Sequence, residues 1–297
     1  AIAFPAKHFE NFYLNGVGGA SDPRVALRDK LILLLMQGAG FRASEALLLW
    51  VTDAFEDPHD NDAVIVRIYN EIDGKAPDNW KSRKGVNKRK AYLQEKYGRI
   101  PRQEMLGTQS LGWKSRVVDH KDSYLEGYFF PNEYRYVFMK LWREYLVYRA
   151  AVHCNHPYAF ISFDSRYLGN PYTQNAFNQS YALGLRRIGL EPNKAEGLDP
   201  HGHRHRFGRE LTSAGVDPLI RKKCLHHKSL ESQTVYTMPS SQQVSNALSN
   251  ASDQLKLESD TPKLANSFDW KTLAEHGFED IDPDGYFTGK NPRLGKK

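Results

Sequence analysis

The chain contains 297 residues, of which 40% are hydrophobic, and it carries a net charge of +6. This length is enough to bury a sizeable core in one large domain or two small ones. Its two cysteines exclude a disulfide framework, and its most apolar run, residues 31–36, is far too short to cross a bilayer. We therefore expect an intracellular protein with no signal peptide and no membrane partner. A basic balance is typical of proteins that bind polyanions, among which nucleic acid is the commonest.

The first third of the chain predicts two helices and a strand. Ser21-Asp22-Pro23 is a typical helix start, and leucines follow it at steps of three and four as far as residue 35. This spacing predicts a helix with one buried face. A second helix is expected from about Ala43. The β-branched and aromatic residues of Ala63–Tyr69 predict a strand.

A polar, basic insertion is expected over about residues 72–105. Between residues 81 and 102 there are nine lysines or arginines and a single acidic residue, and three aromatic residues lie among or beside them. Such a charge run is often only a solvated surface. The aromatic residues favour the alternative, a surface that follows the phosphate backbone of DNA. The candidate DNA-binding residues are Lys81, Arg83, Lys84, Lys88, Arg89 and Lys90.

The rest of the chain predicts a hairpin, three further helices and a polar end. We expect residues 112–130 to form a β-hairpin with Lys114 near the end of its first arm. Amphipathic spacing predicts helices over about 132–151, 175–190 and 240–257. From residue 258 onward the sequence is polar and weakly patterned, so we expect a loosely ordered tail there.

The stretch from His201 to Tyr236 gathers the residue types that phosphodiester chemistry needs. His201 and Arg204 lie one turn apart if this segment is helical, so both can face one site. His227 follows 23 residues after Arg204, and Tyr236 follows nine residues after His227. Guanidinium groups bind anions, imidazoles move protons and an activated phenol is a nucleophile. The combination therefore indicates attack on a phosphodiester.

These residues resemble the signature of the tyrosine recombinases, the phage integrase family. The family's pattern is His-x-x-Arg, then a Leu-Gly-His-like triplet, then a tyrosine at these separations. Leu225-His226-His227 departs from the triplet by having histidine where glycine is usual. Upstream, Gly40-Phe41-Arg42-Ala43-Ser44-Glu45 is similar to the family's Gly-x-Arg-x-Ser-Glu box. The resemblance covers roughly residues 20–240.

The resemblance implies a role for each matching residue. Tyr236 would be the nucleophile that forms a 3′-phosphotyrosyl link, and Glu45 would hold Arg42 in place. A lysine on a hairpin would be the general acid, and Lys114 fits this role best, with Lys81 as its rival. No metal or nucleotide cofactor is implied, and no carboxylate or thiolate spacing beside the histidines supports a zinc site. The implied catalytic residues are Arg42, Lys114, His201, Arg204, His227 and Tyr236.

The predicted fold is mainly α with a small antiparallel β-sheet, an α+β domain of the tyrosine-recombinase catalytic type. We expect residues 1–239 to form this catalytic domain, interrupted by the insertion at about 72–105. The helix at 240–257 is expected to bury its apolar stripe on its own domain or on a neighbouring protomer. Residues 258–297 would form the tail. The family's N-terminal core-DNA-binding domain is expected to be absent from this chain.

The leading functional hypothesis is a site-specific recombinase or integrase that acts on double-stranded DNA as a homotetramer. Its expected location is the cytoplasm, at the nucleoid of a prokaryotic or phage-infected cell. One alternative is a DNA-relaxing enzyme of type IB topoisomerase character, which shares the chemistry. A second alternative is a non-catalytic DNA-binding protein of the same fold.

Overall fold

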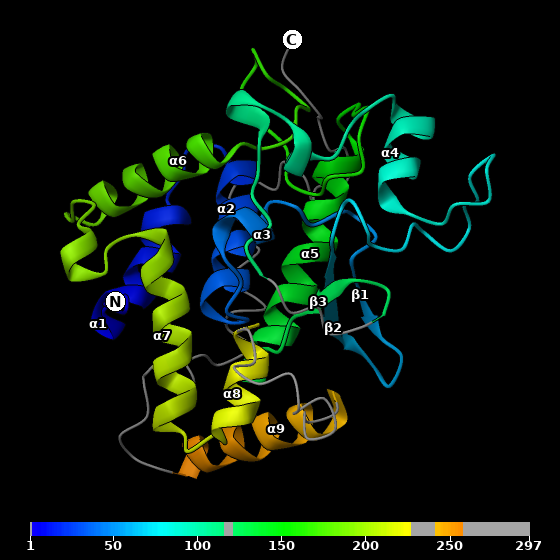
Figure 1. Ribbon diagram of the computed structural model, residues 1–297. Helices are drawn as coiled ribbons and strands as arrows, with labels where there is room; N and C mark the ends of the chain where they lie inside the picture. Colours follow the sequence, from blue (N-terminus) through cyan, green and yellow to red (C-terminus); the bar gives the residue numbers. More distant parts are fainter. Residues whose placement is uncertain (1, 116–120, 227–240, 258–297) are drawn as a thin grey trace, which may run out of the picture.

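The computed structural model describes residues 2–115, 121–226 and 241–257, and Figure 1 shows a helical body with a small sheet on one side. The sheet consists of β1 (Ala54–Asp57), β2 (Asp60–Tyr69) and β3 (Tyr124–Glu126). The helices are α1 (Ala6–Asn11), the π-helix η1 (Phe12–Val17), α2 (Pro23–Gln37), α3 (Ala43–Ala46), α4 (Arg89–Tyr97), α5 (Tyr134–Ala150), α6 (Gln174–Arg187), α7 (Pro200–Ser213), α8 (Pro218–Cys224) and α9 (Ser241–Leu257).

The fold class is mainly α with a small antiparallel sheet, as the sequence predicted. The strand order is β1-β2-β3, and both pairings are antiparallel. The strand predicted over residues 63–69 is the second part of β2. β1 was not predicted, because its four residues, Ala-Phe-Glu-Asp, show little β-strand preference. No described helix is both long enough and apolar enough to span a membrane.

The hairpin predicted over residues 112–130 is wrong in the part that the structure describes. Residues 112–115 form no strand, and β3 pairs with β2 instead, with Arg67 opposite Glu126. β2 is the longer and central strand, so its second edge offers backbone groups that β3 satisfies.

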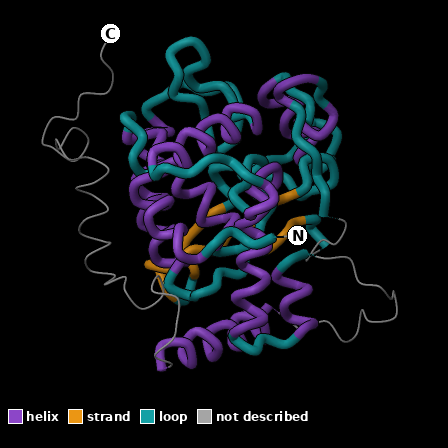
Figure 2. The backbone as a smooth tube through the Cα atoms, turned by 90° about the vertical axis from the view of Figure 1, so that its left-hand side faces the viewer, coloured by secondary structure: helices purple, strands orange, loops and turns teal. Residues whose placement is uncertain are grey.

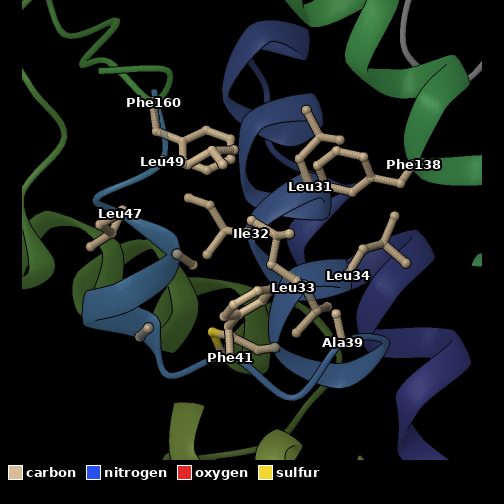
Figure 3. Close-up of a cluster of buried hydrophobic side chains, with 14 of the residues drawn as sticks. Leu31, Ile32, Leu33, Leu34, Ala39, Phe41, Leu47, Leu49, Phe138 and Phe160 are labelled. Atoms are coloured by element: carbon tan, nitrogen blue, oxygen red, sulfur yellow. The ribbon is translucent and has the colours of Figure 1, made fainter. Parts of the chain in front are cut away.

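Helix α2 is the centre of the core. Its side chains from Ala26 to Gln37 are all buried, because α5, α7, η1, α3 and α6 all pack around it. Figure 3 shows Leu31 and Leu34 facing Phe138 of α5, and Ile32 lying between Leu47, Leu49 and Leu33. The prediction of one buried face was therefore wrong: this helix is buried on every side.

The basic insertion is attached to the body by two buried arginines. Arg89, at the start of α4, forms an ion pair with Asp53 in which both side chains are at most 3% exposed. The guanidinium of Arg89 also lies over the rings of Trp50 and Tyr69, at 4.0 and 4.1 Å from their centres. Arg102 is fully buried and donates to three backbone carbonyls, those of Leu47, Gln109 and Tyr172.

Helix α9 covers one end of the molecule. Figures 1 and 2 show it running across the lower ends of α7 and α8. Val244, Leu248 and Ala251 are buried in a cluster that contains Phe207 and Leu211 of α7. The apolar stripe of α9 is thus covered within its own chain, and docking of this helix on a neighbouring protomer stays a prediction.

A buried histidine joins α7 to the N-terminal segment. The ring of His203 stacks on Phe4 at 4.2 Å. Its Nε2 is 2.8 Å from the Tyr181 hydroxyl and its Nδ1 is 3.0 Å from the Gln37 side-chain oxygen. Burial lowers the pKa of His203 from 6.5 to about 3. The imidazole is therefore neutral in the folded protein at neutral pH.

His203 should make stability depend on pH. Below about pH 6.5 the unfolded chain binds a proton at this residue that the folded chain does not, so the stability is complete above that pH and is lost as the pH falls toward about 3. We expect the contribution of His203 to the slope of the unfolding free energy to rise to about 1.4 kcal/mol per pH unit as the pH falls toward about 5.

Urea denaturation at several pH values between about 7 and 5 measures this slope. His203→Gln removes the titrating group and should flatten the slope, whereas His59→Gln, at an exposed position, is the matched control. An equal slope in wild type and His203→Gln would contradict the assignment.

Candidate active site

A pocket of about 480 Å³ runs along one face of α7. It brings together three of the predicted site residues, Arg42, His201 and Arg204, although Arg42 lies about 160 residues upstream of the other two. The lining consists of Arg42, His201, Arg204, His205, Gly208, Arg209, Thr212, Ser213, Arg221 and Leu225.

The helical turn predicted for His201 and Arg204 is present at the start of α7. Asp199 caps this helix by accepting a hydrogen bond from the backbone N–H of Gly202 at 3.0 Å, and Pro200 occupies the first turn. These start signals fix where α7 begins. They thereby fix which face of the helix carries His201 and Arg204.

Arg204 is held by the backbone on both sides of the pocket. It is 3% exposed, and its two terminal nitrogens donate to the carbonyl oxygens of Gly40 and Leu225. Burial, followed by repulsion from Arg42, lowers the pKa of Arg204 to about 10. The group is still a cation at neutral pH, and its position is fixed before any ligand arrives.

Arg42 is positioned by a buried carboxylate. Glu45 is fully buried and accepts hydrogen bonds from the Arg42 side chain at 2.9 Å and from the Arg42 backbone N–H at 3.0 Å. Ser115 completes the group: its hydroxyl accepts from Arg42 at 2.8 Å and donates to Glu45 at 2.7 Å. Burial raises the pKa of Glu45, but the charge of Arg42 and these hydrogen bonds outweigh it, so the pKa lies below its ordinary value. Glu45 thus contacts both the side chain and the backbone of Arg42.

Gly40 connects the two arginine segments. Its φ of +69° is in the left-handed region, and a Cβ there would lie 2.5 Å from the ring of Phe207 in α7. Its carbonyl accepts from Arg204. Glycine is therefore required at this point for both conformation and space.

His201 faces a second histidine across one turn of α7. The rings of His201 and His205 are 4.4 Å apart and nearly perpendicular. Burial, together with the positive charge of Arg204, lowers the pKa of His201 below its ordinary value. The pKa of His205 is also lowered, first by burial and then by His201. Both imidazoles are therefore mainly neutral at pH 7, and each can accept a proton.

His226 occupies a conformation that favours glycine. Its φ is +49°, in the left-handed region. This explains the residue expected in the Leu-Gly-His-like triplet, because glycine adopts that conformation without strain. The ring of His226 stacks on Phe41 at 5.2 Å, and its Nε2 is 2.8 Å from the carbonyl oxygen of Glu126. Burial lowers its pKa to about 4. His226 thus packs the end of α8 against the Arg42 box and β3.

The two candidate lysines lie in different places. Lys114 is exposed and directly precedes Ser115, whose hydroxyl contacts Arg42. Lys81 is exposed in the loop before α4, which Figure 1 separates from α7. His227 and Tyr236 lie outside the described residues, so their predicted roles stay predictions.

The candidate DNA-binding residues divide into exposed and occupied side chains. Lys81, Arg83 and Lys84 are exposed on the loop before α4. Lys88 donates to the carbonyl oxygen of Asp73 at 2.6 Å, and Lys90 pairs with Glu104 at 2.6 Å. The prediction for Arg89 was wrong, because its side chain is 2% exposed and engaged with Asp53.

Sequence reasoning missed several residues of the pocket. His205, Arg209, Thr212 and Ser213 could have been found by extending the helical spacing from His201 along α7. Nothing in the sequence marks Ser115 or Arg221, because each reaches the site through the tertiary fold. Within the described ranges, no group of three or more histidine, cysteine or acidic side chains is arranged to hold a metal ion.

The left-handed backbone conformation at residue 226 should lower the stability of any variant with a side chain there other than glycine. His226→Ala and His226→Gly remove the same ring contacts, but alanine retains the left-handed strain and glycine does not. We expect His226→Gly to be the more stable of the two by about 1 kcal/mol. Urea denaturation of both variants measures the difference. A more stable alanine variant would show that the left-handed conformation is not maintained.

No curated protein sequence matches the chain. Among solved structures, it is similar to the XerH site-specific recombinase bound to difH substrate in a pre-cleavage complex, with 15% identity, a TM-score of 0.46, and coverage of 79% of this chain and 51% of that one. The post-cleavage complex of XerH with palindromic difH substrate gives 16% identity, a TM-score of 0.47, and coverage of 83% and 53%. This chain spans about half the length of those recombinase chains.

A protein-family model matches part of the sequence. The model of the phage integrase family matches residues 135–243, a segment that includes α7 with His201 and Arg204. This is the family that the residue spacing predicted, and its model matches about a third of the chain.

Proposed function

We propose that the protein is a site-specific DNA recombinase that cuts and rejoins strands through a tyrosine–DNA intermediate. This proposal rests on one observation: Arg42, Arg204 and His201 line the same pocket. No carboxylate lines that pocket within the described residues, and Glu45, which lies beside it, is buried behind Arg42. Such a cationic pocket favours an anion as ligand. The family match makes a DNA phosphodiester the anion of choice.

In the proposed cleavage step, the hydroxyl oxygen of Tyr236 attacks the scissile phosphorus. The bond from phosphorus to the tyrosine oxygen forms as the bond to the 5′ oxygen breaks. A free tyrosine has a pKa of ~10, so the proton of Tyr236 must be accepted, and His201 is the proposed acceptor. Lys114 would protonate the departing 5′ oxygen. A 5′ hydroxyl from another strand then reverses these steps, so the sequence is balanced without metal or ATP.

The arginines would act on the transition state. The non-bridging oxygens of the phosphate gain charge as phosphorus becomes pentavalent, so cations placed beforehand stabilise this state more than the ground state. Arg204 and Arg42 are both fixed by protein hydrogen bonds in the absence of DNA. His227 is proposed to add a further hydrogen bond to the phosphate.

We also propose double-stranded DNA as the partner and a homotetramer as the assembly. Exchange between two duplexes requires the cleavage of four strands, and each phosphotyrosyl link uses one Tyr236. Four copies of the chain therefore supply the nucleophiles for a complete exchange. The exposed Lys81, Arg83 and Lys84 add a surface that attracts the DNA backbone.

The nucleophile is tested with a nicked suicide substrate, which traps the covalent intermediate. Wild type should form a protein–DNA adduct, and Tyr236→Phe should form none while it still binds DNA. Gel analysis under denaturing conditions detects the adduct. If Tyr236→Phe forms the adduct, the nucleophile is a different residue; if wild type binds DNA without forming one, the enzymatic function is wrong.

The general acid is tested by comparing Lys114→Ala with Lys81→Ala. Loss of the acid should slow cleavage by ~10²–10⁴-fold on an ordinary substrate. A 5′-thio leaving group needs no protonation. It should therefore restore the cleavage rate only in the variant that lacks the general acid. We expect this rescue for Lys114→Ala. Rescue of Lys81→Ala instead would transfer the role to Lys81.

A further inference from the structure

The pocket continues along α7 well beyond the predicted catalytic residues. His201, Arg204, His205, Gly208, Arg209, Thr212 and Ser213 all line it. These positions recur at steps of three and four, so they form one continuous face of the helix. From His201 to Ser213 this face is about 18 Å long at 1.5 Å per residue. A DNA strand advances about 3.4 Å along the duplex axis per nucleotide, and the groove is several times longer, so it is long enough for more than one phosphate.

Two further arginines line this groove beyond Arg204. Arg209 is exposed on α7, and Arg221 reaches the groove from α8. Within the part of the chain that the structure describes, Arg209 forms no ion pair. Neither arginine has a role in the proposed cleavage step, which uses the groups around Arg42 and Arg204.

Arg221 is oriented by protein contacts but keeps free donors. Its Nη1 donates to the hydroxyl of Thr212, and that hydroxyl donates to the carbonyl oxygen of Gly208 at 2.8 Å. A guanidinium carries five N–H donors, and in the described part of the chain this is the single hydrogen bond of the Arg221 side chain. Thr212 therefore fixes the direction of the fork without satisfying it.

The charge of the groove identifies its ligand class. Four arginines and two histidines line it, and no acidic side chain among the described residues does so. Apart from the pairing of Arg42 with Glu45, no ion pair among the described residues neutralises these arginines, so their charges repel one another and a bound polyanion removes this cost. Arg204 and Arg209 are five residues apart, or about 7.5 Å along the helix axis.

We propose that Arg209 and Arg221 form a second phosphate-binding subsite, which holds a phosphate one or two nucleotides from the scissile phosphate on the same strand. This inference rests on the proposed function. The subsite would hold the strand on one side of the cleavage point, so that the scissile phosphate is presented to Arg42 and Arg204 in register. Arg209 and Arg221 are thus positioning residues.

The subsite is tested by neutralising single phosphates. A set of suicide substrates carries one methylphosphonate at each of the two positions on either side of the scissile phosphate. Adduct formation is measured in single turnover for wild type, Arg209→Ala, Arg221→Ala and the control Arg166→Ala. Arg166 is an exposed arginine outside the pocket, paired with Asp164. Arg209 is also exposed, so its replacement leaves the core unchanged.

We expect about a tenfold loss of rate when either arginine is removed, and a similar loss when wild type acts on the substrate with the matching phosphate neutralised. The two losses should not add: Arg209→Ala should be insensitive to the methylphosphonate at that one position. Arg166→Ala should behave as wild type on every substrate.

Additive losses at all four positions would overturn the subsite, as would rates for Arg209→Ala and Arg221→Ala equal to that of the control. These outcomes require that wild type forms the adduct. If wild type forms no adduct on the unmodified substrate, the proposed function fails instead, so the two failures are distinguishable.

Discussion

The candidate site depends on holding two guanidinium groups beside each other in a partly buried pocket. Their mutual repulsion is offset by Glu45, which is buried behind Arg42, and by the carbonyls of Gly40 and Leu225, which fix Arg204. Like charges held close together near a protein surface repel one another by several kcal/mol, so an uncompensated pair would separate. The contacts formed during folding therefore offset the repulsion between the two guanidinium groups. A ligand anion meets donors that are already in place.

Like Arg204, two other arginines are buried and donate hydrogen bonds to protein groups, at the places where the insertion contacts the body. Arg89 is paired with Asp53 and lies over two aromatic rings, and Arg102 donates to three carbonyls from separate segments. Removing one partner from such an arrangement leaves a buried charge, which is costly. The insertion is thus attached by strong polar contacts at the start of α4 and near its own C-terminal end. Lys81, Arg83 and Lys84, on the loop before α4, present their charges to solvent.

Local patterns in the sequence predicted the parts of the fold and site that depend on neighbours along the chain. Asp22 and Pro23 mark the start of α2, and the spacing of His201 and Arg204 predicts their shared face on α7. The misplaced hairpin and the full burial of α2 depend on partners remote in sequence. Arg89 shows the limit most clearly: in a run of basic residues it looks like surface, and only its partner 36 residues upstream shows that it is core. His227 and Tyr236 lie outside the described residues, so for them the sequence pattern remains the sole basis.

The close approach of Gly40 to Phe207 has a consequence for the design of chimaeras from this sequence. The loop at Gly40 and helix α7 share one packed volume and one hydrogen bond, because the Cα of Gly40 abuts the Phe207 ring while its carbonyl accepts from Arg204. A chimaera that takes α7 from one parent and residues 38–42 from another would inherit a mismatch in both. The two segments therefore form a single inheritable block, despite the 160 residues between them.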